Sequence, residues 1–392
     1  METPSIGGRR PRLPAIALRM PVATGSGIVV LTIALLWPDK GSYTPWSGEA
    51  APIGDLARWL LSAWTEPAFY TCAFAGAGLL IGAIFAYYLE AARSPWRGIG
   101  LACGSGLWPW TVASSLLGLV FSNIAWGWTL RDTGTWQPTF VAVVSVAPTI
   151  VLTYGAGWRP ALTGAVLSAV LVAPLSIAAT HLVCRPLGLP LVAGVTGGMA
   201  IGAFLSFAVC HFLPWLSSYS VQTGGAKAQE VKAPDRGLAW ALRRMLADFS
   251  EAQFFGNEWA SIGLILGAVL AYVVAPGVPV YGSGLLPMVL TGQGIAAMIG
   301  MTLWHRKWTQ SGFYPTFVPI VSVVPAATLA FGGATMPVLG SAVLGAIIGA
   351  PLAAAISARL PEGFHPFIGN VASMAISTVA IIPALGLRFT AS

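Results

Sequence analysis

The stretch PTFVAVVSVAPTIVLTYGAG begins at Pro138, and a close copy, PTFVPIVSVVPAATLAFGGA, begins at Pro315. Both copies open with Pro-Thr-Phe and place a serine, Ser145 or Ser322, three residues before a further proline that is matched between the copies. Proline and serine matches that keep the same order are uncommon by chance between two apolar segments. The sequence therefore predicts an internal repeat, and the extent of that repeat decides the fold.

Composition places this repeat in a membrane. Of the 392 residues, 56% are hydrophobic and 8% are charged, and the mean hydropathy is +0.76, whereas a soluble domain carries roughly 25% charged residues. Such a chain cannot cover a water-facing surface, so we expect an all-α polytopic protein whose main partner is the lipid bilayer. The net charge of +7 is spread over short loops. This distribution indicates how the chain is oriented in the membrane and does not indicate a basic groove for nucleic acid. We therefore expect no nucleic-acid partner.

A transmembrane helix needs about 20 mostly apolar residues. Eleven stretches of the chain come close to this requirement, at about 20–37, 67–89, 107–129, 138–156, 160–182, 190–214, 258–275, 285–304, 315–333, 337–358 and 366–387. We interpret the first stretch as a signal anchor that stays in the membrane, with a cleaved signal peptide as the alternative.

The repeat extends upstream of its two most similar copies. GSGL occurs at 104–107 and again at 282–285, and IGAIFAYY at 81–88 matches LGAVLAYV at 266–273. We therefore predict about 11 transmembrane helices, made of one N-terminal helix and two repeats of five helices. The chain would divide into an N-terminal part with the first helix and an interfacial segment, repeat 1, a cytoplasmic linker with an amphipathic helix, and repeat 2, at residues 1–66, 67–215, 216–256 and 257–392.

The basic residues predict the orientation. With the N-terminus in the cytoplasm, five of the 20 Lys and Arg residues lie outside and the other 15 lie inside, as the positive-inside rule requires. We expect a multi-pass protein of the plasma (inner) membrane with a cytoplasmic N-terminus. Because each repeat has an odd number of spans, the second repeat would enter the bilayer from the opposite face. Inverted repeats of this kind place a site at the midplane, where they meet.

The repeated serines and prolines are the first candidates for that site. Pro148 and Pro325 lie about ten residues into their predicted spans, near mid-depth, where a proline frees a carbonyl. Ser145 and Ser322 precede them by three residues. Freed carbonyls at this depth are tolerated when they line a cavity or are buried in protein. We expect a polar, kinked wall from each repeat. The alternative is that these residues only kink and pack helices.

Other polar residues recur at matched positions. Gln293 aligns with Ser115 in the two GSGL spans. An amide exposed to lipid is costly, so Gln293 should face the interior between the repeats. Thr139 and Thr316 follow the prolines that open their spans, where exposed N–H groups attract anions or dipoles. Simple capping at the membrane surface is the alternative for both threonines.

His365 and Asn370 stand in GFHPFIGN near the start of the last span, and we include both in the predicted solute pathway. No acidic residue stands in the middle of a predicted span, since Glu66 and Glu258 are at span edges, so we do not expect a carboxylate relay across the membrane. The sequence has no GxxxxGK[ST] loop and no Cys/His spacing of the zinc type. We therefore predict no enzymatic activity, no catalytic residue, no cofactor and no metal.

These observations together predict a transporter or channel that moves a small neutral or weakly charged solute, and a homo-oligomer is compatible with this interpretation. The layout alone is similar to urea transporters and ammonium channels, which also use inverted halves of five spans. Two alternatives stay open. A membrane-embedded enzyme acting on a lipid-linked substrate would need acidic metal-binding runs, which the sequence lacks. A non-catalytic membrane assembly subunit would leave the repeat of matched breaks unexplained.

Overall fold

The computed structural model describes residues 53–216 and 237–389, which are called here the first and second segments. Both segments consist of helices and connecting loops, and neither contains a strand, so the predicted all-α class is confirmed for them. The first predicted span, 20–37, and residues 217–236 of the polar linker lie outside the described residues.

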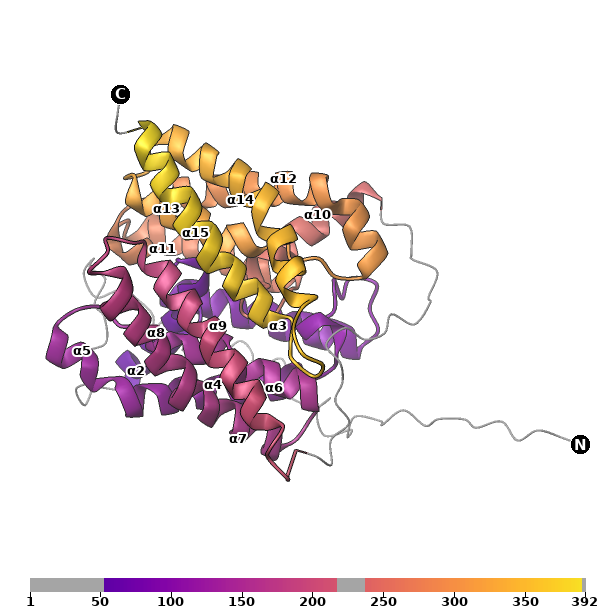
Figure 1. Cartoon of the computed structure of the whole chain (residues 1–392). Helices are drawn as coiled ribbons and strands as arrows, with labels where there is room; N and C mark the ends of the chain where they lie inside the picture. The colour runs from indigo at the N-terminus through magenta and orange to yellow at the C-terminus, as the bar shows by residue number, and fades with distance from the viewer. Residues whose placement is uncertain (1–52, 217–236, 390–392) are drawn as a thin grey trace, which may run out of the picture. The chain divides into compact units, whose positions relative to one another are not determined.

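The first segment begins with the short amphipathic helix α2 and continues through α9 (Figure 1). Its elements are α2 (Ile53–Ala63), η2 (Glu66–Ala68), α3 (Ala73–Ala91), η3 (Ala102–Gly104), α4 (Trp108–Trp126), α5 (Trp128–Thr133), η4 (Thr139–Val144), α6 (Val146–Tyr154), α7 (Trp158–Leu167), η5 (Ser168–Val172), α8 (Ala173–Ala178), η6 (Ala179–Cys184) and α9 (Leu191–Cys210). The elements η5 and η6 are π-helical, so α7 through η6 form one continuous helical segment.

The second segment has a similar order of elements. They are α10 (Leu238–Ala247), η7 (Asp248–Ser250), α11 (Glu258–Val274), η8 (Val280–Gly282), α12 (Leu286–Ser311), η9 (Val318–Val321), α13 (Val323–Ala330), α14 (Thr335–Ser357) and α15 (Phe367–Phe389). The helix α10 contains the amphipathic stretch predicted at the end of the linker, and it packs against α11 and α12.

Six described helical segments are long and apolar enough to cross a membrane. They are α3, the continuous segment Trp158–Cys184, α9, α12, α14 and α15. Three shorter apolar segments accompany them, at Thr139–Tyr154, Glu258–Val274 and Val318–Ala330. Length and composition thus make a membrane protein with several transmembrane helices plausible.

The helices α3 and α11 form the tightest helix contact between the two segments. A Cβ atom added to Gly78 would overlap the carbonyl oxygen of Gly263, and the reverse is also true. One turn further along α3, Gly82 lies against the backbone of Trp259. On the other side of the crossing, Gly267 lies against the backbone of Phe74. Residue numbers rise on one helix as they fall on the other, so α3 and α11 run antiparallel, with small residues that let the backbones touch.

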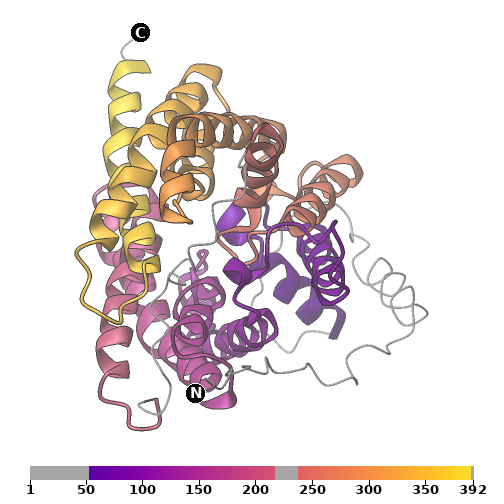
Figure 2. The same cartoon turned by 90° about the vertical axis from the view of Figure 1, so that its right-hand side faces the viewer.

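A second contact between the segments is made by their last helices. The helix α15 packs along both α14 and α9. Figures 1 and 2 both show α15 beside α9. Gly197 of α9 lies close to Ala375 of α15 at this contact. The two segments are therefore joined at their first long helices and at their last ones.

Aromatic residues fill the interior close to the start of α3 and α11. Trp64, Tyr70 and Phe255 are among the largest fully buried side chains. The rings of Trp64 and Phe255 meet edge to face, with centroids 6.0 Å apart, and Trp108 approaches Phe255 at 5.8 Å. Burial of such rings is the largest apolar contribution that single side chains make to a core. It holds the first segment against the turn that precedes α11.

Candidate functional site

The two copies of the PTF stretch form interrupted helices. The 3₁₀ segment η4 ends at Val144, the backbone of Ser145 leaves the helical region (φ −121°, ψ −114°), and α6 begins at the next residue. In the same way η9 ends at Val321, Ser322 leaves the helical region (φ −137°, ψ −93°), and α13 follows. The breaks fall at the serines rather than at Pro148 and Pro325. Each proline instead lies in the first turn of the new helix, where its missing N–H costs nothing.

Both serines at the breaks are fully buried. The Ser322 hydroxyl donates to the Val318 carbonyl at 2.6 Å, and the Ser145 hydroxyl lies 3.4 Å from that of Ser168. The Ser322 hydroxyl thus satisfies a carbonyl of the segment before its break, whereas the Ser145 hydroxyl contacts another side chain. The kink that the sequence predicts at each proline is thus a full interruption three residues earlier.

Gln293 on α12 is completely buried and joins three other parts of the chain. Its amide nitrogen donates to the carbonyls of Ile320 at 2.8 Å and Ala68 at 3.2 Å, and its amide oxygen accepts from the Tyr70 hydroxyl at 2.8 Å. Ile320 lies just before the break at Ser322. The Gln293 side chain therefore connects the second interrupted helix to the turn that precedes α3.

The threonines that open the interrupted segments have different partners. The Thr139 hydroxyl donates to the side-chain oxygen of Asn123 at 2.9 Å. The Thr316 hydroxyl donates to the Asp248 carboxylate at 2.6 Å and accepts from the Trp308 indole at 3.1 Å. Thr139 thus has a neutral partner, whereas Thr316 connects its segment to a charged group.

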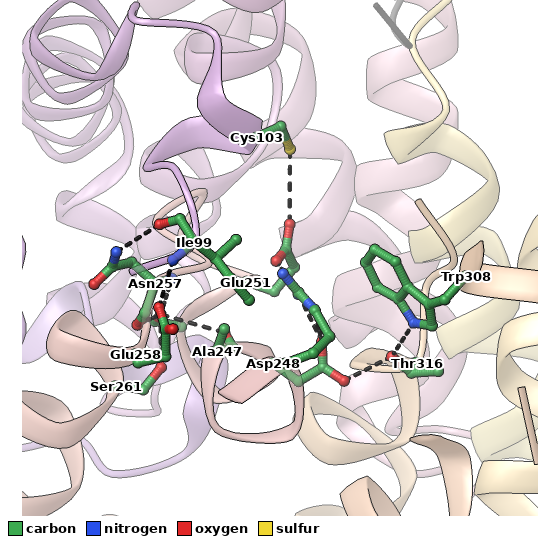
Figure 3. A network of polar contacts seen from close by, with 12 residues as sticks. Ile99, Cys103, Ala247, Asp248, Glu251, Asn257, Glu258, Ser261, Trp308 and Thr316 are labelled. Carbon is green, nitrogen blue, oxygen red and sulfur yellow. Dashed lines mark hydrogen bonds and ion pairs between the residues drawn. The ribbon is translucent and has the colours of Figure 1, made fainter. Parts of the chain in front are cut away.

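Asp248 belongs to a buried charge cluster that sequence reasoning missed (Figure 3). Arg244 is 4% exposed and pairs with Asp248 at 2.6 Å and with Glu251. The Arg244 guanidinium also lies 4.6 Å from the ring centroid of Trp308, a distance suited to a cation–π contact. Arg244 and Asp248 are four residues apart, and this spacing is equally typical of an exposed helical ion pair. Nothing in the local pattern shows that the pair is buried.

A second set of bonds joins the start of α11 to the loop after α3 (Figure 3). The Asn257 side chain caps α11 by accepting from the Trp259 amide at 2.8 Å and donates to the Ile99 carbonyl at 2.6 Å. The Glu258 carboxylate accepts from the Ile99 amide at 2.6 Å and pairs with Arg243 at 2.5 Å. The network fixes the loop that leads to the GSGL motif of the first segment.

The loops before the two GSGL spans have the same unusual backbone. Ala102 and Cys103 have φ of 48° and 57°, and Val280 and Tyr281 have φ of 55° each. Left-handed conformations at two consecutive residues with Cβ atoms are costly, and tertiary contacts must hold them. The Ala102 amide donates to the Phe255 carbonyl at 3.2 Å, and the Val280 amide donates to the Tyr70 carbonyl at 3.1 Å. Each loop is therefore held by the turn that precedes the first long helix of the other segment.

The remaining predicted residues lie apart from these groups. Ser115 is buried on α4. The His365 ring accepts from the Phe367 amide at 3.1 Å, lies nearly parallel to the ring of Phe207, and has its pKa lowered to about 4 by burial. Asn370 is buried in the first turn of α15. No hydrogen bond joins any of these three to the interrupted helices within the described segments.

Within the described segments, no three His, Cys, Asp or Glu side chains are grouped as a metal site would require. Comparison with known proteins finds no protein-family model and no curated protein that matches this sequence. The function is therefore inferred from the geometry of the chain itself.

Proposed function

We propose that this chain is an integral membrane transporter or channel that moves a small neutral or weakly charged solute. The observation that carries the proposal is the pair of interrupted helices, which break at Ser145 and Ser322. Non-helical backbone at membrane depth is tolerated where it is buried in protein or lines a cavity. In transporters, discontinuous helices of this kind form the substrate site between repeats.

The contacts support two inverted repeats around this site. The helices α3 and α11 have matching sequences and cross antiparallel, as helices related by a two-fold axis in the membrane plane would do. The contact is reciprocal, because Gly82 meets Trp259 while Gly267 meets Phe74. The left-handed loops before α4 and α12 are also reciprocal, because each one bonds to the turn before the first long helix of the other segment. Eleven spans, with a cytoplasmic N-terminus and the inner membrane as location, remain part of the proposal.

The chemistry near the breaks favours an uncharged solute. Hydroxyls and one amide lie near the breaks, at Ser145, Thr149, Ser168, Ser322 and Gln293. These groups donate and accept hydrogen bonds and supply no fixed charge. A small solute with both donors and acceptors could exchange bonds with them one at a time, whereas an ion would lack a counter-charge.

Uptake of a panel of small polar solutes into proteoliposomes tests the proposal. The variant Ser322→Ala removes the hydroxyl at one break and should lower uptake roughly fivefold, equivalent to the ~1 kcal/mol of one hydrogen bond. Ser341→Ala is the matched control, because Ser341 is also buried and donates to a local carbonyl, that of Val338 at 2.7 Å. Uptake of no solute by folded protein, or equal loss in both variants, would contradict the proposal.

A further inference from the structure

Glu66 and Glu251 occupy equivalent places in the two turns that precede α3 and α11. The Phe69 amide donates to the Glu66 carbonyl at 2.8 Å, and the Phe254 amide donates to the Glu251 carbonyl at 2.9 Å. Phe69 and Phe254 have nearly the same left-handed φ, 67° and 64°. The two carboxylates therefore start from the same local backbone.

Each carboxylate reaches the left-handed loop of the other segment. The Tyr281 hydroxyl donates to Glu66 at 3.4 Å, and the Cys103 thiol lies 3.8 Å from Glu251. Cys103 and Tyr281 are matched residues in the loops before the GSGL spans. Both glutamates thus lie at a junction between the two segments.

The two junctions differ in charge. Glu251 is paired with Arg244. Glu66 lies 185 positions before Glu251. The residue 185 positions before Arg244 is Trp59, in α2. No ion pair joins Glu66 to a basic residue in the described parts of the chain. Among the described residues, Glu251 therefore has a positive partner, whereas no described basic residue pairs with Glu66.

The groups around Glu66 are aromatic. Tyr281 faces it from η8, and the rings of Phe69 and Trp136 each pack edge-on against Tyr281, with centroids 6.1 Å away. Among the described residues, the titratable group that contacts the Glu66 carboxylate is the phenol of Tyr281. Burial in these surroundings raises the pKa of Glu66 to about 8. A carboxyl group in this position gains and loses its proton near neutral pH.

We infer that Glu66 is a proton-binding site at the junction of the two repeats, and that the proton is the coupling ion of the transporter proposed above. The inference rests on that proposed function. When the junction is closed, the apolar surroundings favour the neutral carboxyl. Glu66 is half-buried, and when Tyr281 moves away and more water reaches the carboxyl, the ionised form is stabilised and the proton passes from the Glu66 carboxyl to water. Proton occupancy and the state of the junction are thereby linked.

Infrared difference spectroscopy on the full chain in lipid nanodiscs tests the proton site without any transport. The carboxyl C=O band of the wild type should disappear between about pH 7 and 9, the region around the raised pKa. Glu66→Gln should lack this step, and Glu66→Asp should restore a step at a changed pH. Glu362→Gln is the matched control, because Glu362 is exposed, and it should behave as the wild type. A step that survives in Glu66→Gln overturns the assignment.

Uptake into proteoliposomes tests the coupling. With a solute that the wild type carries, an inward proton gradient of one pH unit should drive roughly tenfold accumulation for one proton per solute. Glu66→Gln should lose this accumulation but keep equilibrative exchange. Accumulation that ignores the gradient in the wild type overturns the coupling, even if the infrared step is present. If no solute crosses, the proposed function and the coupling both fail, whereas the infrared result still decides whether Glu66 binds the proton.

Discussion

Gly78 and Gly263 pack backbone to backbone at the crossing of α3 and α11, and a side chain on either residue would overlap the carbonyl oxygen of the other. This reciprocity means that the two helices meet at equivalent residues. In a bilayer the hydrophobic effect does not press helices together, so close backbone packing of small residues provides much of the attraction between them. The crossing is therefore a main determinant of how the two segments are held.

Replacing Gly78 by alanine should destabilise this crossing. The added methyl group must push the backbones apart, and overpacking typically costs about 1–3 kcal/mol. The melting temperature in detergent, followed by intrinsic fluorescence, should fall for Gly78→Ala and for Gly263→Ala. Gly294→Ala on α12 is the control, because nothing lies within 4 Å of its Cβ position. If Gly78→Ala has the same melting temperature as Gly294→Ala, the close packing is not a determinant of stability.

The class of fold was predictable because it depends on composition and on the length of apolar runs. The predicted stretch 107–129 contains α4, and 337–358 coincides closely with α14. The interruption at Ser145 was not predictable, because 138–156 is apolar apart from scattered hydroxyl residues, and the backbone angles of one serine leave no trace in hydropathy. Proline was the visible signal, and it marks the first turn after the break.

Gln293→Leu should lower stability as well as any transport. The substitution leaves the Ile320 and Ala68 carbonyls and the Tyr70 hydroxyl without this partner, and each unsatisfied buried group costs about 1–3 kcal/mol. Tyr70→Phe removes only one of the three bonds and should have a smaller effect. In a double-mutant cycle, the two substitutions should be less than additive, because they share a bond. Full additivity in thermal unfolding would show that the Tyr70 bond contributes nothing.

Arg244→Met should be among the most destabilising single changes in the second segment. It leaves Asp248 and Glu251 buried without a counter-charge, and removing one partner of a buried pair costs about 3–5 kcal/mol. The neighbouring Arg243 is a natural control, since its side chain is 50% exposed where it pairs with Glu258. Arg243→Met should cost less than Arg244→Met, because the Glu258 carboxylate keeps its bond from the Ile99 amide and solvent reaches the Arg243 side of the pair. Equal losses in the two variants would mean that the buried cluster does not stabilise the protein.

The charge cluster also shows where sequence reasoning about the site ended. Arg244, Asp248 and Glu251 recur at helical spacing, which fits a solvated helix face as well as a buried one. Asp248 is bonded to Thr316, which lies 68 residues further along the chain. The two positions become neighbours only when η7 packs near η9. Contacts of this kind depend on the three-dimensional arrangement and have no signature in the spacing of residues.

Thermal stability should depend on pH through Glu66. The pKa of Glu66 is about 8 in the folded protein and roughly 4.3 in an unfolded chain. Because the folded value is raised, the stabilisation is fully present below the unfolded pKa and is lost as the pH rises through the folded pKa. The melting temperature of the wild type should therefore fall relative to Glu66→Gln between about pH 5 and 8. Parallel pH profiles for the two proteins would contradict the raised pKa.

Cysteine labelling on intact cells tests the proposed orientation. Cys72, Cys184 and Cys210 are buried and Cys103 is exposed, so Cys103→Ser provides a background with low reactivity. In that background, an impermeant maleimide should label Ser392→Cys but should label Lys227→Cys only after the membrane is opened. This outcome is expected because 15 of the 20 basic residues lie on the cytoplasmic side in the proposed topology, as the positive-inside rule predicts. The proposed inverted repeats of five spans have a related consequence, because they leave Lys227 and Ser392 on opposite sides of the bilayer. Labelling of Lys227→Cys in intact cells, with Ser392→Cys protected, would reverse the orientation. Equal labelling of both positions in intact cells would place them on one side of the membrane, which two inverted repeats of five spans do not allow.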